Sequence, residues 1–234
     1  MFYGLTFLGL GLMWFYQALT APFLWLSLLL CNAGVCFSLL GFGFLLSRSC
    51  RNGSKWAAVI FGKRNDGRRS LWAYVIHWPF LLVNNLIFWL HWFSKENWCD
   101  EILPNIILGR FPTLADKGRW QKLSIVAVVD MTAEFAACSY VRELAYYALP
   151  TFDETPPSKE ALIEVANWIE EQQQKGPVFI HCARGHGRSA TALAAWLLLK
   201  GKCSSLDEAE ELMKKGRPKV RMSRWQKEML EQLS

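Results

Sequence analysis

The sequence predicts an α/β domain with a small central sheet, preceded by an all-α membrane region. Three observations lead to this expectation. No charged residue occurs before Arg48 in the 234-residue chain. Beyond residue 99, apolar segments with strand and helix patterns alternate, which favours a sheet covered by helices. A motif at 181–189, with the sequence HCARGHGRS, joins one predicted strand to one predicted helix.

Residues 1–47 predict two transmembrane helices, Phe2–Leu19 and Pro22–Leu46, with a break at Thr20 to Pro22. Each segment has the roughly 18–20 apolar residues that are needed to cross a bilayer. A cleaved signal peptide is the alternative for the first segment. That alternative is disfavoured because no basic residue precedes the apolar run and a second span follows at once.

Residues 48–70 form a basic loop, which the positive-inside rule places in the cytoplasm. A merely solvated run of charges is compatible with that placement. The chain has a net charge of +6, and acids and bases balance from residue 99 onward, so the basic excess lies beside the apolar spans. This position indicates an anionic membrane surface as a partner and argues against nucleic acid. The basic residues of the loop are Arg48, Arg51, Lys55, Lys63, Arg64, Arg68 and Arg69.

Residues 71–98 contain a third apolar run, Leu71–Phe93, which is either an interfacial helix or a third membrane helix. Its proline, histidines, asparagines and tryptophans favour a helix that lies at the membrane interface. With two spans, residues 99–234 lie in the cytoplasm; a third span would place them on the other side. We expect an integral protein of the inner or plasma membrane with this domain facing the cytoplasm.

The motif at 181–189 has the pattern of a loop that grips phosphate. Pro177 to Ile180 predicts a short buried strand, and Ala190 to Leu199 predicts a buried helix that Gly201 closes. A loop between them aims backbone N–H groups and a helix dipole at an anion. The same dipoles favour the thiolate form of Cys182. The planar fork of Arg188 can hold two phosphate oxygens.

At these residues the chain resembles the dual-specificity branch of the cysteine-dependent protein tyrosine phosphatases. The resemblance covers roughly Asp100 to Leu233. It includes a first strand and turn at 106–109, a second strand at 124–130 followed by the sequence MTAE, and a loop at 150–158. That loop is most similar to the branch that includes the mitochondrial phosphatidylglycerophosphate phosphatase. The resemblance implies a dual-specificity-phosphatase-like sandwich over residues 99–234.

The chemistry of the motif and the resemblance together indicate which residues are functional. Cys182 is the expected nucleophile, and Ser189 is expected to hydrogen-bond its sulfur. The resemblance gives the general-acid role to Asp153 and a supporting role to His181, with Asp130 as the rival acid. The phosphate-binding residues are expected to be Ala183, Arg184, Gly185, His186, Gly187 and Arg188.

The expected function is hydrolysis of phosphate monoesters through a cysteinyl-phosphate intermediate, without metal or cofactor. Tethering beside a bilayer, the acid loop and the positive character of Arg184 and His186 favour phosphorylated lipid headgroups as substrate. Phosphoproteins remain the alternative substrate. A catalytically inactive module that binds phosphorylated partners is the alternative from another class.

The remaining patterns concern cysteines and helix starts. The seven cysteines are scattered and suggest neither a zinc site nor a disulfide framework. Cys138 is either a resolving thiol for Cys182 or an inert residue. Ser158, Ser205 and Ser223 each predict the start of a helix, the last two as capping boxes with Glu208 and Gln226.

Overall fold

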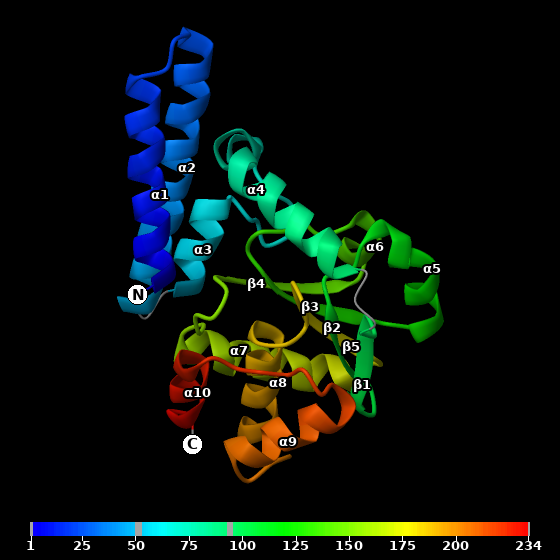
Figure 1. The fold of residues 1–234 in the computed structure, drawn as a ribbon. Coiled ribbons are helices and arrows are strands. Elements are labelled where there is room, and N and C mark those ends of the chain that lie inside the picture. The colour runs from blue at the N-terminus through cyan, green and yellow to red at the C-terminus, as the bar shows by residue number, and fades with distance from the viewer. Residues whose placement is uncertain (1, 50–52, 93–95, 234) are drawn as a thin grey trace.

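The computed structural model describes residues 2–49, 53–92 and 96–233. Four helices precede an α/β domain, and they pack against one end of it (Figure 1). Cys50 and Arg51 of the predicted basic loop, and Phe93 of the third apolar run, lie outside the described residues.

Helices α1 (Phe2–Leu19) and α2 (Leu24–Ser49) form an antiparallel hairpin that projects from the rest of the molecule (Figure 1). Glycines allow the two helices to approach closely. A Cβ at Gly11 would lie 2.4 Å from Ser38 Oγ, and one at Gly41 would lie 2.7 Å from Leu8 Cγ. Both glycines therefore lie in the contact between α1 and α2.

Helix α3 (Gly53–Phe61) occupies part of the region that was expected to be a loop. It forms because Ala57, Ile60 and Phe61 bury one face together with α2 residues such as Leu40. The alternative of a merely solvated run of charges does not hold for Lys63, which follows this helix and is 5 % exposed.

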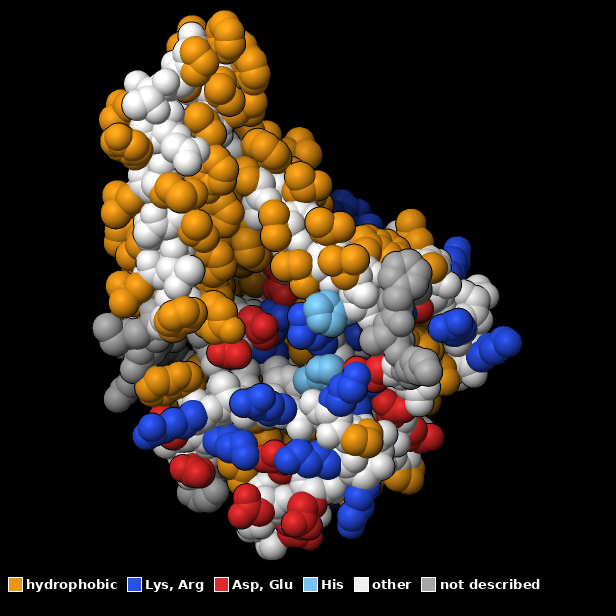
Figure 2. Space-filling view, in the orientation of Figure 1, with side chains coloured by type: hydrophobic (Ala, Val, Ile, Leu, Met, Phe, Trp, Pro, Cys, Tyr) orange, Lys and Arg blue, Asp and Glu red, His pale blue; other side chains and the backbone are white. Residues whose placement is uncertain are grey.

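Helix α4 (Leu71–Trp92) runs obliquely to the hairpin and along the α/β domain (Figure 1). Ala73, His77, Leu81 and Phe88 are buried at intervals of four or seven residues, and this stripe faces the protein. The remaining surface of α4 is apolar and exposed, as is that of the hairpin (Figure 2). Helices α1, α2 and α4 are each long and apolar enough to cross a membrane.

The sheet has five strands in the order β1-β2-β5-β3-β4. Strand β1 is antiparallel to β2, and the other neighbouring pairs are parallel. The parallel strands therefore end at one common edge, where ligands of such sheets bind. The strands are β1 (Cys99–Leu103), β2 (Ile106–Arg110), β3 (Ala127–Thr132), β4 (Ala145–Thr151) and β5 (Val178–Cys182).

Two layers of helices cover the sheet, as the predicted sandwich requires. Alternate strand residues separate the layers, since Val129 and Ile180 belong to one core cluster and Val128 and Phe179 to another. The first face is covered by α7 (Lys159–Gln173), α8 (Arg188–Leu199), α9 (Leu206–Gly216) and α10 (Arg224–Glu231). The second face is covered by short helices, α5 (Lys117–Trp120), α6 (Ser139–Arg142), η1 (Leu114–Asp116) and η2 (Gln121–Leu123).

The predicted helix starts are present. The Ser158 side chain accepts a hydrogen bond from the Ala161 backbone N–H at the start of α7. Ser223 and Gln226 make the reciprocal capping box of α10. At α9 only half of the box forms. Ser205 accepts from the Glu208 N–H, but the Glu208 carboxylate bonds to Ser204 instead of Ser205.

Candidate active site

The loop at 182–188 connects β5 to α8 and encloses the sulfur of Cys182. Cys182 is 3 % exposed, and its Sγ accepts hydrogen bonds from the Gly185 N–H at 3.2 Å and the Ser189 hydroxyl at 3.3 Å. Gly185 has a φ of +77°, and a Cβ there would lie 2.4 Å from the Gly109 carbonyl oxygen. Only glycine fits this turn. The two donors converge on the sulfur.

Arg188 is 1 % exposed and is fixed beside the loop by Glu134. Its Nη1 and Nη2 donate to the two Glu134 carboxylate oxygens at 2.8 and 2.7 Å, and Nη1 also donates to the Thr151 carbonyl at 2.9 Å. Burial would raise the pKa of Glu134, but Arg188 keeps it below its usual range, so the carboxylate stays ionised. Sequence reasoning gave Glu134 no role; its position just after a buried strand was the available signal.

Asp153 lies next to the same guanidinium, on the loop that follows β4. Its Oδ1 is 3.3 Å from Arg188 Nε, and its side chain is 73 % exposed. The residue before it, Phe152, is buried against α2 and α3, with its ring centroid 4.6 Å from that of Phe44 and 5.7 Å from that of Phe61. Packing of Phe152 therefore holds the loop in place, while the carboxylate of Asp153 is accessible.

Asp130, the rival acid, lies in a closed environment. Its side chain is fully buried and accepts hydrogen bonds from Lys63, Thr132 and Tyr146. Burial would raise the pKa of Asp130, but Lys63 and His181 hold it far below its usual range. An enclosed carboxylate that stays ionised is unsuited to donate a proton to a leaving group, so the geometry favours Asp153.

His181 is buried beneath the loop, with its Nε2 3.9 Å from Asp130 Oδ1. Burial lowers the pKa of His181 to about 4, in spite of the nearby carboxylate. The imidazole is therefore neutral near pH 7. Its ring is fully buried, so it is not exposed at the site.

His186 and Arg184, the two other polar residues of the loop, differ in their exposure and their partners. His186 Nε2 lies 2.5 Å from Glu96 Oε1, and burial lowers the pKa of His186. The ring of His186 is partly buried and engaged by Glu96, and its contribution to the positive character of the loop stays a prediction. Arg184 is exposed at the loop. Its role in binding an anion stays a prediction.

Arg217 is a residue of the site that sequence reasoning missed. It is 1 % exposed, and it donates from Nε to the Gly185 carbonyl and from Nη2 to the Arg184 carbonyl, each at 2.9 Å. Its Nη1 also donates to Asp100 Oδ2 at 2.6 Å. It fixes the back of the loop and turns the loop carbonyls away from the anion site. No local pattern in the sequence marks this residue.

Within the described ranges, no group of three or more His, Cys, Asp or Glu side chains is placed to hold a metal ion. The described cysteines are all free, and Cys138 donates to the Pro112 carbonyl.

A strand, a phosphate loop with a buried cysteine and a helix define the class of a cysteine-dependent phosphatase. Residues 106–234 match the family described as dual specificity phosphatase, catalytic domain, and the chain belongs to that family. It is a phosphoric monoester hydrolase of the cysteine-dependent type.

Among curated proteins, the chain is similar to phosphatidylglycerophosphate phosphatase PTPMT2 of Arabidopsis thaliana, with 26 % identity over 167 residues, 68 % of this chain and 72 % of the relative. It is also similar to mouse (Mus musculus) dual specificity protein phosphatase 13B, with 29 % identity over 131 residues, 52 % of this chain and 66 % of that protein.

Two solved structures share the fold. The active form of Tk-PTP is 30 % identical, with a TM-score of 0.53 over 58 % of this chain and 95 % of that chain. PTPMT1 in complex with PI(5)P has the same TM-score at 24 % identity, over 58 % of this chain and 94 % of that chain. The match to PTPMT1 supports the fold alone.

Proposed function

We propose that Cys182 attacks the phosphorus of a phosphate monoester and forms a cysteinyl-phosphate intermediate. The S–P bond forms as the bond to the leaving oxygen breaks, and water later cleaves the S–P bond to release phosphate. Arg188 and the loop amides stabilise the equatorial oxygens during both steps. The support is that the sulfur, the guanidinium and the loop amides lie around one small region at the end of β5.

Asp153 is the proposed general acid in the first step and general base in the second. It protonates the departing oxygen and then accepts a proton from the attacking water. Ser189 donates a hydrogen bond to the sulfur when the thiolate leaves during hydrolysis. His181 supports the loop as a neutral imidazole.

The proposed substrate is a phosphate on a lipid headgroup. The observation that carries this proposal is the packing of the acid loop against the apolar helix α2 and the adjoining α3, through Phe152 with Phe44 and Phe61. Charged side chains and histidines gather where the apolar hairpin and α4 meet the domain (Figure 2). In this proposal a phosphate at the membrane surface reaches the nucleophile, and the exposed Arg184 is available to a second anionic group of the headgroup. The name of the Arabidopsis relative agrees with a lipid substrate.

The proposed topology has two spans, with the catalytic domain in the cytoplasm. Both ends of α4 belong to segments that contact the α/β domain. The Gly67 carbonyl, in the turn before α4, accepts from the Ala137 N–H, and Phe88 near its other end packs on Phe111 and Phe135. A helix that lies along one domain at both ends is suited to the interface and not to a crossing.

The test is a comparison of kcat/KM for the full-length protein on phospholipids in mixed micelles and on phosphotyrosine and phosphoserine peptides. We expect preference for a lipid such as phosphatidylglycerophosphate, and a loss of several-fold or more in Arg184→Ala on lipid alone. Arg224→Ala is a matched control, because Arg224 is exposed and already pairs with Glu228. Preferred peptides, with lipid turnover unchanged in Arg184→Ala, would show a protein phosphatase instead.

A further inference from the structure

The turn at 62–70, between α3 and α4, is inserted into the catalytic domain. Lys63 and Arg69 form an isolated antiparallel bridge across it, and Gly62 has a φ of +59°. The turn contacts the segment after β3 twice, since the Ala137 N–H donates to the Gly67 carbonyl and Arg69 Nη2 donates to the Ala133 carbonyl. The region between the membrane helices thus reaches residues on both sides of Glu134.

Lys63 is the charged side chain that this turn buries in the domain. Its ammonium group donates to Asp130 Oδ2 at 2.6 Å, to Thr132 Oγ1 at 3.1 Å and to the Phe135 carbonyl at 2.6 Å. Three donors meet three acceptors, so the group is fully satisfied without water. A buried charge of this kind persists only with such partners, and removal of its counter-ion lowers the stability of the folded protein.

Asp130 connects Lys63 to the phosphate loop. Its Oδ2 accepts from Lys63 and from the Tyr146 hydroxyl at 2.5 Å, and its Oδ1 accepts from Thr132. The same Oδ1 lies 3.9 Å from Nε2 of His181, the residue before Cys182. Both ring nitrogens of His181 are buried and have no hydrogen-bond partner among the described residues. The position of the Asp130 carboxylate therefore sets the electrostatic environment of His181.

We propose that Lys63 is a positioning residue of the active site, which fixes Asp130 and through it His181 and the loop that holds Cys182. The membrane region then contributes to the reactivity of the phosphatase as well as anchoring it. This inference rests on the proposed role of Cys182, and it assigns a second use to a turn that the sequence suggested was only a basic surface.

The test is a double-mutant cycle in the full-length protein with Lys63→Met, Asp130→Asn and the combination. Two readouts are measured, kcat on a soluble aryl phosphate and the rate of alkylation of Cys182 by iodoacetamide at pH 7. Each single variant leaves a buried group without its counter-ion and so displaces the carboxylate beside His181; we expect each to lose roughly 10- to 100-fold in kcat, as for a small misplacement of a catalytic group. The alkylation rate should fall with kcat, while KM changes little.

The double variant removes both charges together, so its loss should be no greater than that of Lys63→Met alone, within about threefold, as expected of coupled residues. Arg64→Met is the matched control, because Arg64 is in the same turn and exposed, and it should behave like the unmodified protein. Thermal denaturation shows whether each variant is folded. If a single variant is not folded, the folded double variant is compared with the unmodified protein, and it should retain measurable alkylation and turnover.

Two outcomes would overturn the proposal: unchanged kcat and alkylation in Lys63→Met, or losses in the two single variants that multiply in the double variant. A failure of the proposed catalytic role of Cys182 can be distinguished from these two outcomes. Turnover that persists in Cys182→Ser would refute the role of Cys182, whereas the alkylation cycle reports on the Lys63–Asp130 coupling without any substrate.

Discussion

At the scale of single residues, the site depends on which carboxylates are enclosed and which are accessible. Three of the acids near the loop show this contrast. Glu134 and Asp130 are buried and hold cationic partners, while Asp153 is exposed beside Arg188. A buried carboxylate that is paired with a fixed cation is suited to a positioning role. A carboxylate that is exposed at the anion site is suited to proton transfer.

Asp153→Asn should therefore lower kcat by about 10²–10⁴ on alkyl phosphates, whose leaving oxygen needs a proton. The loss should be much smaller on aryl phosphates with a good leaving group. The measurement is kcat across a series of leaving groups, with Glu154→Gln as a control because it changes the neighbouring exposed acid. Equal losses for all leaving groups would remove the general-acid role from Asp153.

Glu134→Gln should free the Arg188 fork from its bidentate partner. A hydrogen bond to a charged group is worth about 1.5–3 kcal/mol, which corresponds to a loss of roughly 10- to 100-fold in kcat/KM. The matched control is Asp116→Asn, because Asp116 is also buried and holds Arg110 through two oxygens at 3.0 Å. Both variants should be less stable in thermal denaturation, but only Glu134→Gln should lose activity in its folded fraction. Equal activity in the two variants would contradict the positioning role of Glu134.

At the scale of elements, the phosphate loop was predictable because its residues are contiguous. Strand, loop and helix follow one another from Val178 to Leu199, and each has a local signature. The partners of the loop were not predictable in this way. Glu134, Arg217 and Lys63 come from three distant segments, and only the folded sheet brings them to Cys182 and Arg188.

The helix at 53–61 and the buried Lys63 were missed for a related reason. A run of basic residues resembles a solvated surface in sequence, and the acceptors that permit its burial lie in another segment, at Asp130, Thr132 and Phe135. The pattern of charges shows how many cations a loop carries, whereas the tertiary contacts decide which of them are buried.

The contact between α2 and the acid loop makes a prediction at this scale. A Cβ at Gly43 would lie 2.5 Å from Phe152 Cζ and 2.5 Å from Ile60 Cδ1, so Gly43→Ala should displace Phe152 and with it Asp153. We expect a loss of roughly 10- to 100-fold in kcat on alkyl phosphates, as for a small misplacement of a catalytic group. Gly9→Ala is the control, because nothing lies within 4 Å of its Cβ position.

The measurement is again kcat with poor and good leaving groups, now in the two glycine variants. Alkylation of Cys182 by iodoacetamide should be unchanged in both, because the loop itself is not disturbed. If Gly43→Ala and Gly9→Ala have the same activity on alkyl phosphates, the hairpin does not hold the acid loop.

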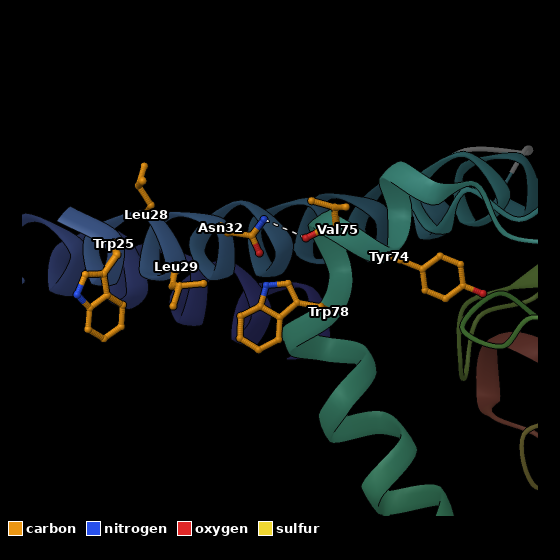
Figure 3. Close-up of a pocket in the computed structure, with 7 residues that line it drawn as sticks. All are labelled: Trp25, Leu28, Leu29, Asn32, Tyr74, Val75 and Trp78. Carbon is orange, nitrogen blue, oxygen red and sulfur yellow. Dashed lines mark hydrogen bonds between the residues drawn. The ribbon is translucent and has the colours of Figure 1, made fainter. Parts of the chain in front are cut away.

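At the scale of the whole molecule, the helices provide two apolar surfaces of different kinds. The hairpin projects away from the domain, whereas α4 lies along it with an exposed apolar face (Figure 1). An open groove of about 670 Å³ separates α2 from the start of α4, and Asn32 Nδ2 donates to the Val75 carbonyl across it (Figure 3). Its lining is almost entirely apolar, as expected for a surface in contact with lipid.

The proposed topology can be tested at this scale. Single cysteines introduced at Thr20, Arg64 and Asn97, all exposed positions, are labelled with a membrane-impermeant maleimide in intact cells. We expect Thr20, in the hairpin turn, to be labelled in intact cells. Arg64 and Asn97 should be labelled only after permeabilisation, because two spans place both of them on the cytoplasmic side. Labelling at Thr20 and Asn97 together in intact cells would mean that α4 crosses the membrane.

The covalent intermediate on a membrane substrate tests the central claim most directly. Ser189→Ala removes the donor that helps the sulfur to leave, so it should slow hydrolysis more than formation of the intermediate. The full-length variant is mixed with vesicles that contain phosphatidylglycerophosphate labelled in its terminal phosphate, and is then quenched in acid. We predict that labelled phosphate accumulates on the peptide containing Cys182, and that adding Cys182→Ser abolishes it. Release of phosphate without any labelled protein, or label that persists without Cys182, would contradict a cysteine-dependent phosphatase acting at the membrane.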